Sequence, residues 1–510
     1  MDLLNEAVFP LLLAIFLWVF YKKIFRPTPK KNLPPSPRGL PVLGNLHQLK
    51  LLPHHSLRAL AQEHGPIMFL RFGSIPNVII STPEAAKHVL KTHDLTFSDR
   101  PYSNISAKLL YNLKDVALAP YGEQWRQLKT IFVHQLLSNK KVSEFRCIRE
   151  QEIALMVEKI KGFSSISSSS NLSDLITFTT NDIVCRSAFG RKYSEGEHGE
   201  KLRFLFTEFA HVMGTEGIGA FIPWLKWLDR VTGFDTRVTN LTKELDEFLD
   251  IMVQERLDYK FQNIGSSTGN EIGRSGEDFL DIVLRIHMDN SSDVSMDREN
   301  VKAMILDVFA AGANTIAALG EWVMSELIRH PNIMKKLQNE IREILSGKKD
   351  ITENDIDKMN FLKAVVKETL RLHPPNPLLV PRAAREDVEI MGYHISAGTT
   401  IIINGWAIGR DPGSWDKPDE FFPERFLNSS IDYKGQDFQL IPFGAGRRGC
   451  PGMSFAMANN ELMLVNLLHK FDWTLPNGIK GEDLDMTEGF GLSTRRQNPL
   501  LAVATPIPFY

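Results

Sequence analysis

The chain has 510 residues, of which 43% are hydrophobic, enough to form a large buried core. Its 59 Lys and Arg residues nearly balance its 61 Asp and Glu residues, so the charge gives no indication of binding to nucleic acid. Only three cysteines occur, which excludes a disulfide framework and is typical of a reducing compartment.

The first predicted element is a membrane anchor at residues 3–21. This stretch of 19 residues is apolar apart from Asn5 and Glu6, and a helix needs roughly 20 residues to span a bilayer. A cleaved signal peptide is the alternative, and it would have a basic start and a small-residue cleavage site. Here Asp2 and Glu6 make the start acidic, and basic residues follow the apolar run. We therefore expect an uncleaved anchor, with the following chain in the cytosol.

Residues 22–41 are predicted to form a basic and proline-rich hinge, and residues 42–510 a single large domain. The prolines between residues 33 and 41 fix the backbone, so the hinge should be stiff and extended. Strand-like runs occur at residues 66–83 and 378–404, and the pattern between them is mainly helical. The sequence therefore predicts a mainly α fold with a small β-rich part.

The segment Gly217–Leu228 is apolar and aromatic but short. One interpretation is that it belongs to the core. The other is that it forms a loop that dips into a membrane and collects a lipophilic substrate.

Residues 296–329 carry a long amphipathic helical pattern that ends at His330, directly before a proline. Small residues occupy its middle, where Gly312 is followed two positions later by Asn314 and then by Thr315. Small side chains let a flat cofactor lie against a helix. The hydroxyl of Thr315 can bond to the carbonyl one turn back or to a bound water.

Glu368 and Arg371 lie three residues apart on a predicted helix, so they share one face. An exposed pair of this kind contributes only about 0.2–0.5 kcal/mol. The spacing is common, so the pair is a weak motif by itself.

Cys450 lies in the run Phe443–Gly452, which contains four glycines, Gly446 among them. Glycines allow the backbone to approach a flat cofactor closely, and nearby positive charge such as that of Arg448 keeps a thiolate deprotonated. The apolar run from Met453 predicts a helix that begins at the sulfur and directs its positive dipole end toward it. The pattern is typical of a cysteine that serves as the axial ligand of haem iron. A glycine-rich turn around an inert cysteine is the alternative.

The order of these features along the chain resembles that of the cytochrome P-450 monooxygenases. The features are the apolar start, the proline hinge, the helix with Thr315, the Glu368–Arg371 pair, the run Phe421–Phe426 and the Cys450 loop. The last two runs are similar to those of the microsomal A-type plant members of specialised metabolism. The resemblance implies the P-450 fold in a haem-containing catalytic domain, with haem b (iron protoporphyrin IX) held by the Cys450 thiolate. It also implies a single-pass protein of the endoplasmic reticulum membrane with its catalytic domain in the cytosol. NADPH-cytochrome P-450 reductase is the implied partner, because the chain has no evident flavin or NADPH fingerprint.

The resemblance also assigns residues to the haem. Positively charged side chains are expected to bind its two propionates, and Lys129 stands where family members often have arginine, so it keeps the charge but loses the bidentate fork. The expected cofactor-binding residues are Arg100, Trp125, Lys129, Arg382, Phe443, Gly446 and Arg448. Arg425 joins Glu368 and Arg371 in the family's buried ion network under the Cys450 loop, which maintains the fold and retains the haem.

Gly312, Asn314 and Thr315 are the expected catalytic residues, and Asn314 departs from the family, which has Asp or Glu at this position. An amide cannot pass a proton as a carboxyl group does. Either Asn314 still orients water and ordinary monooxygenation proceeds, or proton delivery is altered. The second alternative favours desaturation, cyclisation, dehydration or rearrangement without net oxygen insertion.

By their position in the family, loops over the haem should line the substrate pocket. They are largely apolar, which predicts a lipophilic ligand of moderate size, such as a terpenoid or an alkaloid. Asn314 and Asn376 are the candidate polar anchors, and any of the lining residues could instead belong to the core. The predicted pocket residues are Phe309, Ala313, Asn376, Leu378, Leu379 and Phe490.

We therefore predict a haem-thiolate monooxygenase that uses O2 and electrons from NADPH to oxidise a lipophilic plant metabolite. A non-enzymatic alternative is a membrane-bound haem carrier or gas sensor. The apolar pocket and Thr315 argue against it, and it would show no substrate-dependent consumption of NADPH.

Overall fold

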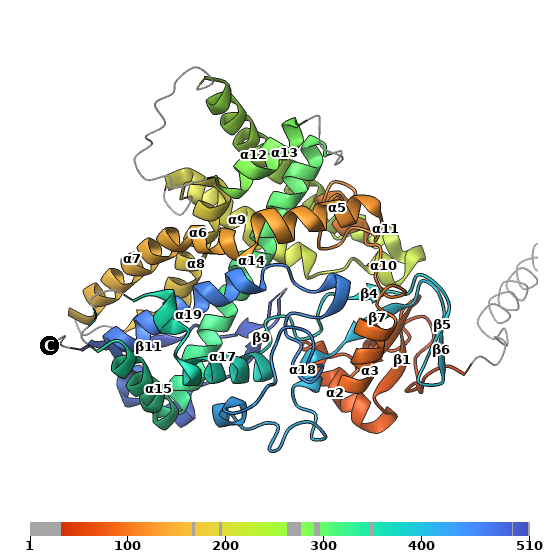
Figure 1. The fold of residues 1–510 in the computed structure, drawn as a ribbon. Coiled ribbons are helices and arrows are strands. Elements are labelled where there is room, and N and C mark those ends of the chain that lie inside the picture. Colours follow the sequence, from red (N-terminus) through yellow and green to blue (C-terminus); the bar gives the residue numbers. More distant parts are fainter. Residues whose placement is uncertain are drawn as a thin grey trace, which may run out of the picture.

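The computed structural model describes residues 32–165, 169–192, 196–262, 277–289, 296–346, 348, 351–491 and 493–507. Helices form most of the molecule, and the strands β1, β4 and β7 gather with β5 and β6 at one end (Figure 1). The prediction of a mainly α fold with a small β-rich part is confirmed. The anchor expected at residues 3–21 and the first half of the hinge, residues 22–31, lie outside the described residues.

The helices vary from single turns to one that runs through the middle of the molecule (Figure 1). The longer ones are α2 (Pro53–His64), α5 (Glu123–Ile131), α7 (Arg146–Ser165), α8 (Leu172–Phe189), α9 (Gly196–Met213), α12 (Phe234–Gln262), α13 (Phe279–Met288), α14 (Arg298–Arg329), α15 (Pro331–Ile344), α17 (Asn360–Leu372) and α19 (Met453–Lys470). The short ones are α3 (Pro83–Lys87), α4 (Asn104–Leu109), α6 (Asn139–Glu144), α10 (Ile218–Phe221), α11 (Lys226–Val231), α16 (Glu353–Ile356) and α18 (Gly405–Ile408).

The largest sheet has the strand order β1-β2-β7-β4, in which β2 and β7 are parallel and the other pairs antiparallel. Its register places Val78 opposite Ile401, and both side chains are buried. Arg382 pairs with Ile401 from the other side, which carries this arginine into the interior. The strands are β1 (Ile67–Phe72), β2 (Ile75–Ile80), β3 (Ser170–Asn171), β4 (Arg382–Ala383), β5 (Val388–Ile390), β6 (Tyr393–Ile395), β7 (Thr400–Ile403), β8 (Phe471–Thr474), β9 (Glu488–Gly489), β10 (Arg495–Arg496) and β11 (Leu501–Pro506).

Helix α14 is the axis of the core. A reciprocal capping box between Asp297 and Asn300 starts it, and it ends before His330, close to the predicted bounds. Within the described residues it is the one helix long and apolar enough to cross a membrane, but 67% of its apolar stretch is buried inside the protein. We interpret it as a core helix.

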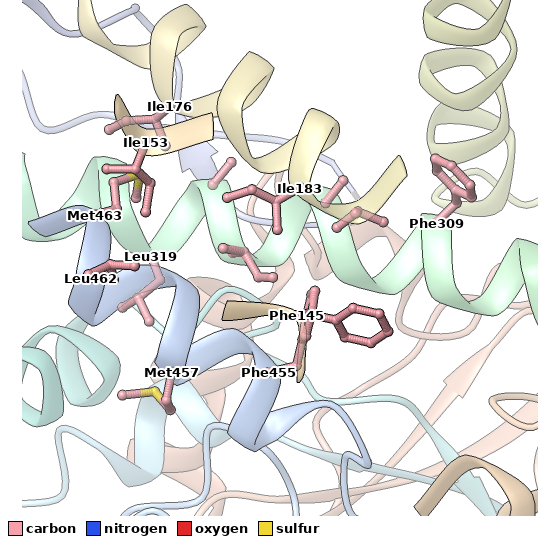
Figure 2. Packing of buried hydrophobic residues seen from close by; sticks show 14 of the residues in the cluster. Phe145, Ile153, Ile176, Ile183, Phe309, Leu319, Phe455, Met457, Leu462 and Met463 are labelled. Carbon is pink, nitrogen blue, oxygen red and sulfur yellow. The ribbon is translucent and has the colours of Figure 1, made fainter. Parts of the chain in front are cut away.

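Helices α8 and α19 pack against α14, as Figure 2 shows for Ile183, Leu319 and Met463. A Cβ on Gly320 would come within 2.6 Å of the terminal methyl carbon of Met463, so this side chain of α19 packs directly on the glycine of α14. This packing buries α14 from Ile316 onward and leaves the preceding turn beside a cavity.

Candidate active site

A cavity of about 280 Å³ lies between α14 and the loop that precedes α19. Ala311, Gly312 and Thr315 form one wall, and Phe443 and Cys450 belong to the other. The two sequence motifs that were predicted to hold opposite faces of one cofactor therefore do face the same space.

Cys450 presents its sulfur to this cavity. The backbone N–H of Cys450 donates to the carbonyl of Phe443 at 2.9 Å, which closes the loop. Gly446 has a φ of +67°, and a Cβ there would lie 2.4 Å from the Leu90 carbonyl oxygen, so only glycine fits. Helix α19 begins at Met453, as predicted, and its N-terminus points toward the sulfur.

Burial raises the pKa of the Cys450 thiol, whereas the backbone N–H of Gly452 and the ammonium group of Lys129 act to lower it. Lys129 on α5 donates from Nζ to the Gly449 carbonyl at 2.8 Å and lines the cavity. Burial lowers the pKa of Lys129 to about 8, against the attraction of Cys450. The cation that acts on the sulfur is therefore Lys129, whereas the sequence indicated Arg448.

Arg100, Arg382 and Arg448 converge on one end of the cavity. The guanidinium of Arg448 lies 4.1 Å from the centre of the Trp125 ring. Trp125 itself donates from Nε1 to the Val116 carbonyl at 2.9 Å. The three arginines donate mainly to backbone carbonyls. Arg448 donates to those of Ser98 (2.7 Å) and Ala119 (2.5 Å), and Arg100 to those of Val380 (2.6 Å) and Ala117 (2.9 Å). Arg382 donates to that of Ala445 (2.6 Å).

Mutual repulsion marks this end of the cavity as an anion site. Burial, followed by the positive charges of Arg448 and Arg382, lowers the pKa of Arg100 well below its usual range. Burial also lowers the pKa of Arg448 to about 10, and the charge of Arg382 adds to this. Buried cations that repel one another are stabilised by an anionic ligand. A flat cofactor with two carboxylates and an iron that takes a thiolate fits this donor set.

Thr315 donates from Oγ1 to the Ala311 carbonyl at 2.6 Å, as the sequence predicted. A Cβ on Gly312 would make only an ordinary contact with Val184, at 3.5 Å, so packing within the protein does not require glycine there. Asn314 is half-buried on α14 and does not belong to the residues that line the cavity.

Of the residues predicted to line the substrate pocket, Asn376 and Leu379 do so. The other four do not. Phe309 is buried in an aromatic stack with Phe189 and Phe206, with ring centres 4.9 and 4.4 Å away. It points away from the cavity because its face of α14 packs on neighbouring helices (Figure 2).

The three remaining residues lie in other surroundings. Ala313 is buried in the helical core, and Leu378 packs against the cluster around β1 and β2. Phe490 is 56% exposed, in the turn after β9. Helical periodicity and position in the family indicated the right segments here, but not the direction in which each side chain points.

The sequence missed a pair of buried carboxyl groups, of which Asp307 lines the cavity and Asp115 lies behind it. Asp307 accepts hydrogen bonds from the backbone N–H groups of Val116 (2.6 Å) and Ala117 (3.4 Å). Asp115 is completely buried and accepts one from Leu118 at 2.6 Å. Burial, and then the neighbouring charge of Asp115, raises the pKa of Asp307 well above its usual range. The sequence feature that could have indicated this pair is Asp307 itself, an acidic residue within the apolar helical pattern of residues 296–329.

The ion network of Glu368, Arg371 and Arg425 is formed. Both Glu368 and Arg371 are fully buried, and they make two hydrogen bonds of 2.8 Å. Arg425 donates to the same carboxylate at 3.1 Å, and the backbone N–H of Phe422 does so at 2.7 Å. Arg371 also donates to three backbone carbonyls, those of Gly409, Pro418 and Glu420.

Comparisons with known proteins agree with this geometry. Residues 34–501 match the family model described as Cytochrome P-450. The chain is 54% identical to Cytochrome P-450 736A117 of Prunus mume, over 97% of this chain and 95% of that protein. It is 46% identical to the tabersonine/lochnericine 19-hydroxylase of Catharanthus roseus, over 98% of both chains. A structure of a zebra fish cytochrome P-450 with progesterone has a TM-score of 0.74 at 24% identity, over 90% of this chain and all of that one, and shows the fold alone.

Proposed function

The chain belongs to the cytochrome P-450 family and is a haem-thiolate enzyme. We propose that it inserts one oxygen atom into a lipophilic plant metabolite, a terpenoid or an alkaloid. The observation that carries the proposal is the cavity between Thr315 and Cys450, whose wall is mostly apolar. A relative whose name states hydroxylation of tabersonine and lochnericine supports the substrate class.

Bound haem b supplies the activation of O2 at an iron held by the Cys450 thiolate. The protein contributes the surroundings. Lys129 and the three cavity arginines would bind the propionates and so fix the orientation of the cofactor. Thr315 donates its hydroxyl proton to the Ala311 carbonyl, so the free lone pairs of its Oγ1 can accept a hydrogen bond from a water and hold that water in the cavity as a proton carrier. Apolar residues such as Val308 and Leu379 exclude bulk water and hold the substrate.

A second candidate function is oxidation without net oxygen insertion, and Asn314 favours it. Its amide stands directly before Thr315 on α14, where family members have a carboxyl group. Because an amide is neither an acid nor a base near neutral pH, it cannot relay a proton as a carboxyl group can. An altered proton supply at the haem would be the feature that favours desaturation, cyclisation, dehydration or rearrangement over oxygen insertion.

The membrane location rests on two exposed apolar regions that share a face. Trp224 and Trp227 are 59% and 58% exposed, so the aromatic side chains of the segment Gly217–Leu228 face outward, whereas its Ile222 is buried. The Ser74 N–H donates to the Phe221 carbonyl at 2.8 Å, and Gly73 donates to Leu43 at 3.1 Å. The aromatic segment therefore lies beside the end of the hinge, where an anchored protein would meet the endoplasmic reticulum membrane on its cytosolic side.

Microsomes that contain this protein and an NADPH-cytochrome P-450 reductase would test the proposal. Terpenoids and indole alkaloids are supplied with and without NADPH, and product masses are measured. A product heavier by one oxygen atom, formed only with NADPH, is the expected result. A product lighter by two hydrogens or by water would replace it with the second candidate, and Asn314→Asp should then restore oxygen insertion.

A further inference from the structure

A second cluster of titratable side chains lies outside the cavity, where the first turn of α2 meets β9. The Nε2 atoms of His54 and His55 lie 2.7 and 2.8 Å from the same carboxylate oxygen, Oε2 of Glu488. One donor atom from each of the three side chains falls within 4.8 Å of the other two. The cluster joins two segments more than 430 residues apart in the sequence.

The surroundings hold the three side chains in place. The side chains of His54 and Glu488 are 3% and 8% exposed, whereas that of His55 is 47% exposed. The Trp406 ring lies 4.1 Å from the His55 ring and meets the His54 ring edge-on at 5.3 Å. Asn404 fixes the backbone of His54 by donating to its carbonyl at 2.8 Å. The cluster is therefore held together from several sides and has one open side, at His55.

The ring nitrogens of the two histidines decide what the cluster can bind. A neutral imidazole carries its proton on either ring nitrogen. When the proton sits on Nδ1, each Nε2 lone pair faces the carboxylate oxygen, and a cation between them meets three ligands.

We propose that His54, His55 and Glu488 bind a zinc ion, with a water molecule as the fourth ligand on the open side at His55. Two imidazoles, one carboxylate and one water form a common tetrahedral zinc site. Zinc–ligand bonds of about 2.0–2.1 Å place tetrahedral ligands roughly 3.3 Å apart. The present separations of 2.7 and 2.8 Å therefore need to widen by only about 0.5 Å, which small rotations of the side chains supply.

Neighbouring cations set the affinity. Arg410 lies 3.9 Å from the centre of the Trp406 ring and Arg58 lies 5.4 Å from it, and Arg410 interacts electrostatically with Glu488. Their charge opposes a dication, so we expect micromolar rather than nanomolar binding. Occupancy would tie α2 to β9 and so restrain the turn that carries Phe490. The site is independent of the function proposed above.

Zinc binding to the full-length, haem-loaded protein would be measured by titration calorimetry with zinc chloride. We expect one zinc per chain, released by EDTA. His55→Ala and Glu488→Gln should each raise the Kd at least tenfold. His64→Ala is the matched control, because His64 lies at the other end of α2 and outside the cluster. Its Kd should equal that of the wild type, and the carbon-monoxide difference spectrum of each variant would show that it is folded.

The zinc X-ray absorption spectrum gives a second readout that does not depend on substitutions. Two imidazoles and only oxygen or nitrogen ligands are expected. Sulfur in the first shell would assign the metal to a cysteine and overturn the proposal. The proposal also fails if wild-type binding is weaker than millimolar, or if His64→Ala weakens it as much as His55→Ala.

Discussion

The charge of Glu368 is predicted to be essential to the fold under the Cys450 loop. The Glu368→Gln substitution keeps the shape of the side chain but removes the anion that accepts from Arg371, Arg425 and the backbone of Phe422. Arg371 is 1% exposed, so water cannot replace the lost partner. Breaking one member of a buried ion network costs about 3–5 kcal/mol. At about 1.4 kcal/mol per tenfold change, the ratio of folded to unfolded protein falls roughly a hundredfold to a few thousandfold.

The assay is the urea concentration at which half of the haem-thiolate carbon-monoxide signal is lost. Glu424→Gln is the matched control, because Glu424 lies in the same turn as Arg425 but pairs with the half-exposed Lys336 at 2.7 Å. Such a surface pair contributes about 0–1 kcal/mol, so this control should behave almost as the wild type does. Equal midpoints for the two variants would refute the reasoning, because the network would then contribute no more than a surface pair.

Three further outcomes are expected. Cys450→Ala should abolish the thiolate signature in the carbon-monoxide difference spectrum while far-ultraviolet circular dichroism stays native, and a normal spectrum would disprove the ligand assignment. Thr315→Ala should lower the product formed per NADPH consumed roughly tenfold or more, since the hydroxyl that holds the proton-carrying water is lost. Thr130→Ala on α5 should leave that ratio unchanged, although the Thr130 hydroxyl also donates to the carbonyl one turn back. Acid should weaken the fold through Glu326: burial acts to raise its pKa, but the hydrogen bonds from His330 and His373 lower it from 4.5 to about 2. A carboxyl group whose pKa is lower in the folded than in the unfolded protein stabilises the fold at pH values above its unfolded-state pKa. The free energy of unfolding should therefore fall by about 3 kcal/mol between roughly pH 5 and pH 2. Glu326→Gln should make the free energy of unfolding depend less on pH in that window.

Local patterns in the sequence were sufficient for the parts of the site that are made by one segment. The glycine spacing around Cys450 predicted a loop that leads into a helix, and α19 begins at Met453. The Thr315 hydrogen bond to the carbonyl of Ala311 follows from helical geometry alone. In the same way, residues 296–329 were predicted as one helix, and the structure has Arg298–Arg329.

Contacts between distant segments were not predictable in the same way. Phe309 stands two residues after Asp307, so helical periodicity could not decide which of the two faces the cavity. Three-dimensional packing decided it, since Phe189 and Phe206 bury the phenylalanine and the aspartate is left at the wall. The meeting of His54 with Glu488 depends on the whole chain folding back on itself, and no local pattern indicates it.

Charged residues from several separate sequence motifs hold the same segment of the cavity wall, residues 116–119. Arg100 and Arg448 hold the carbonyls of the segment 116–119, Asp307 holds two of its N–H groups, and Trp125 binds the same segment from α5. Directly before this segment, Tyr111, Asn112 and Leu113 have positive φ values, so the chain that leads into it is strained. The arginines that hold the loop are also the ones that we propose to bind the haem propionates. On that proposal, haem binding and the position of this wall of the cavity would be coupled, because both would use the same guanidinium groups.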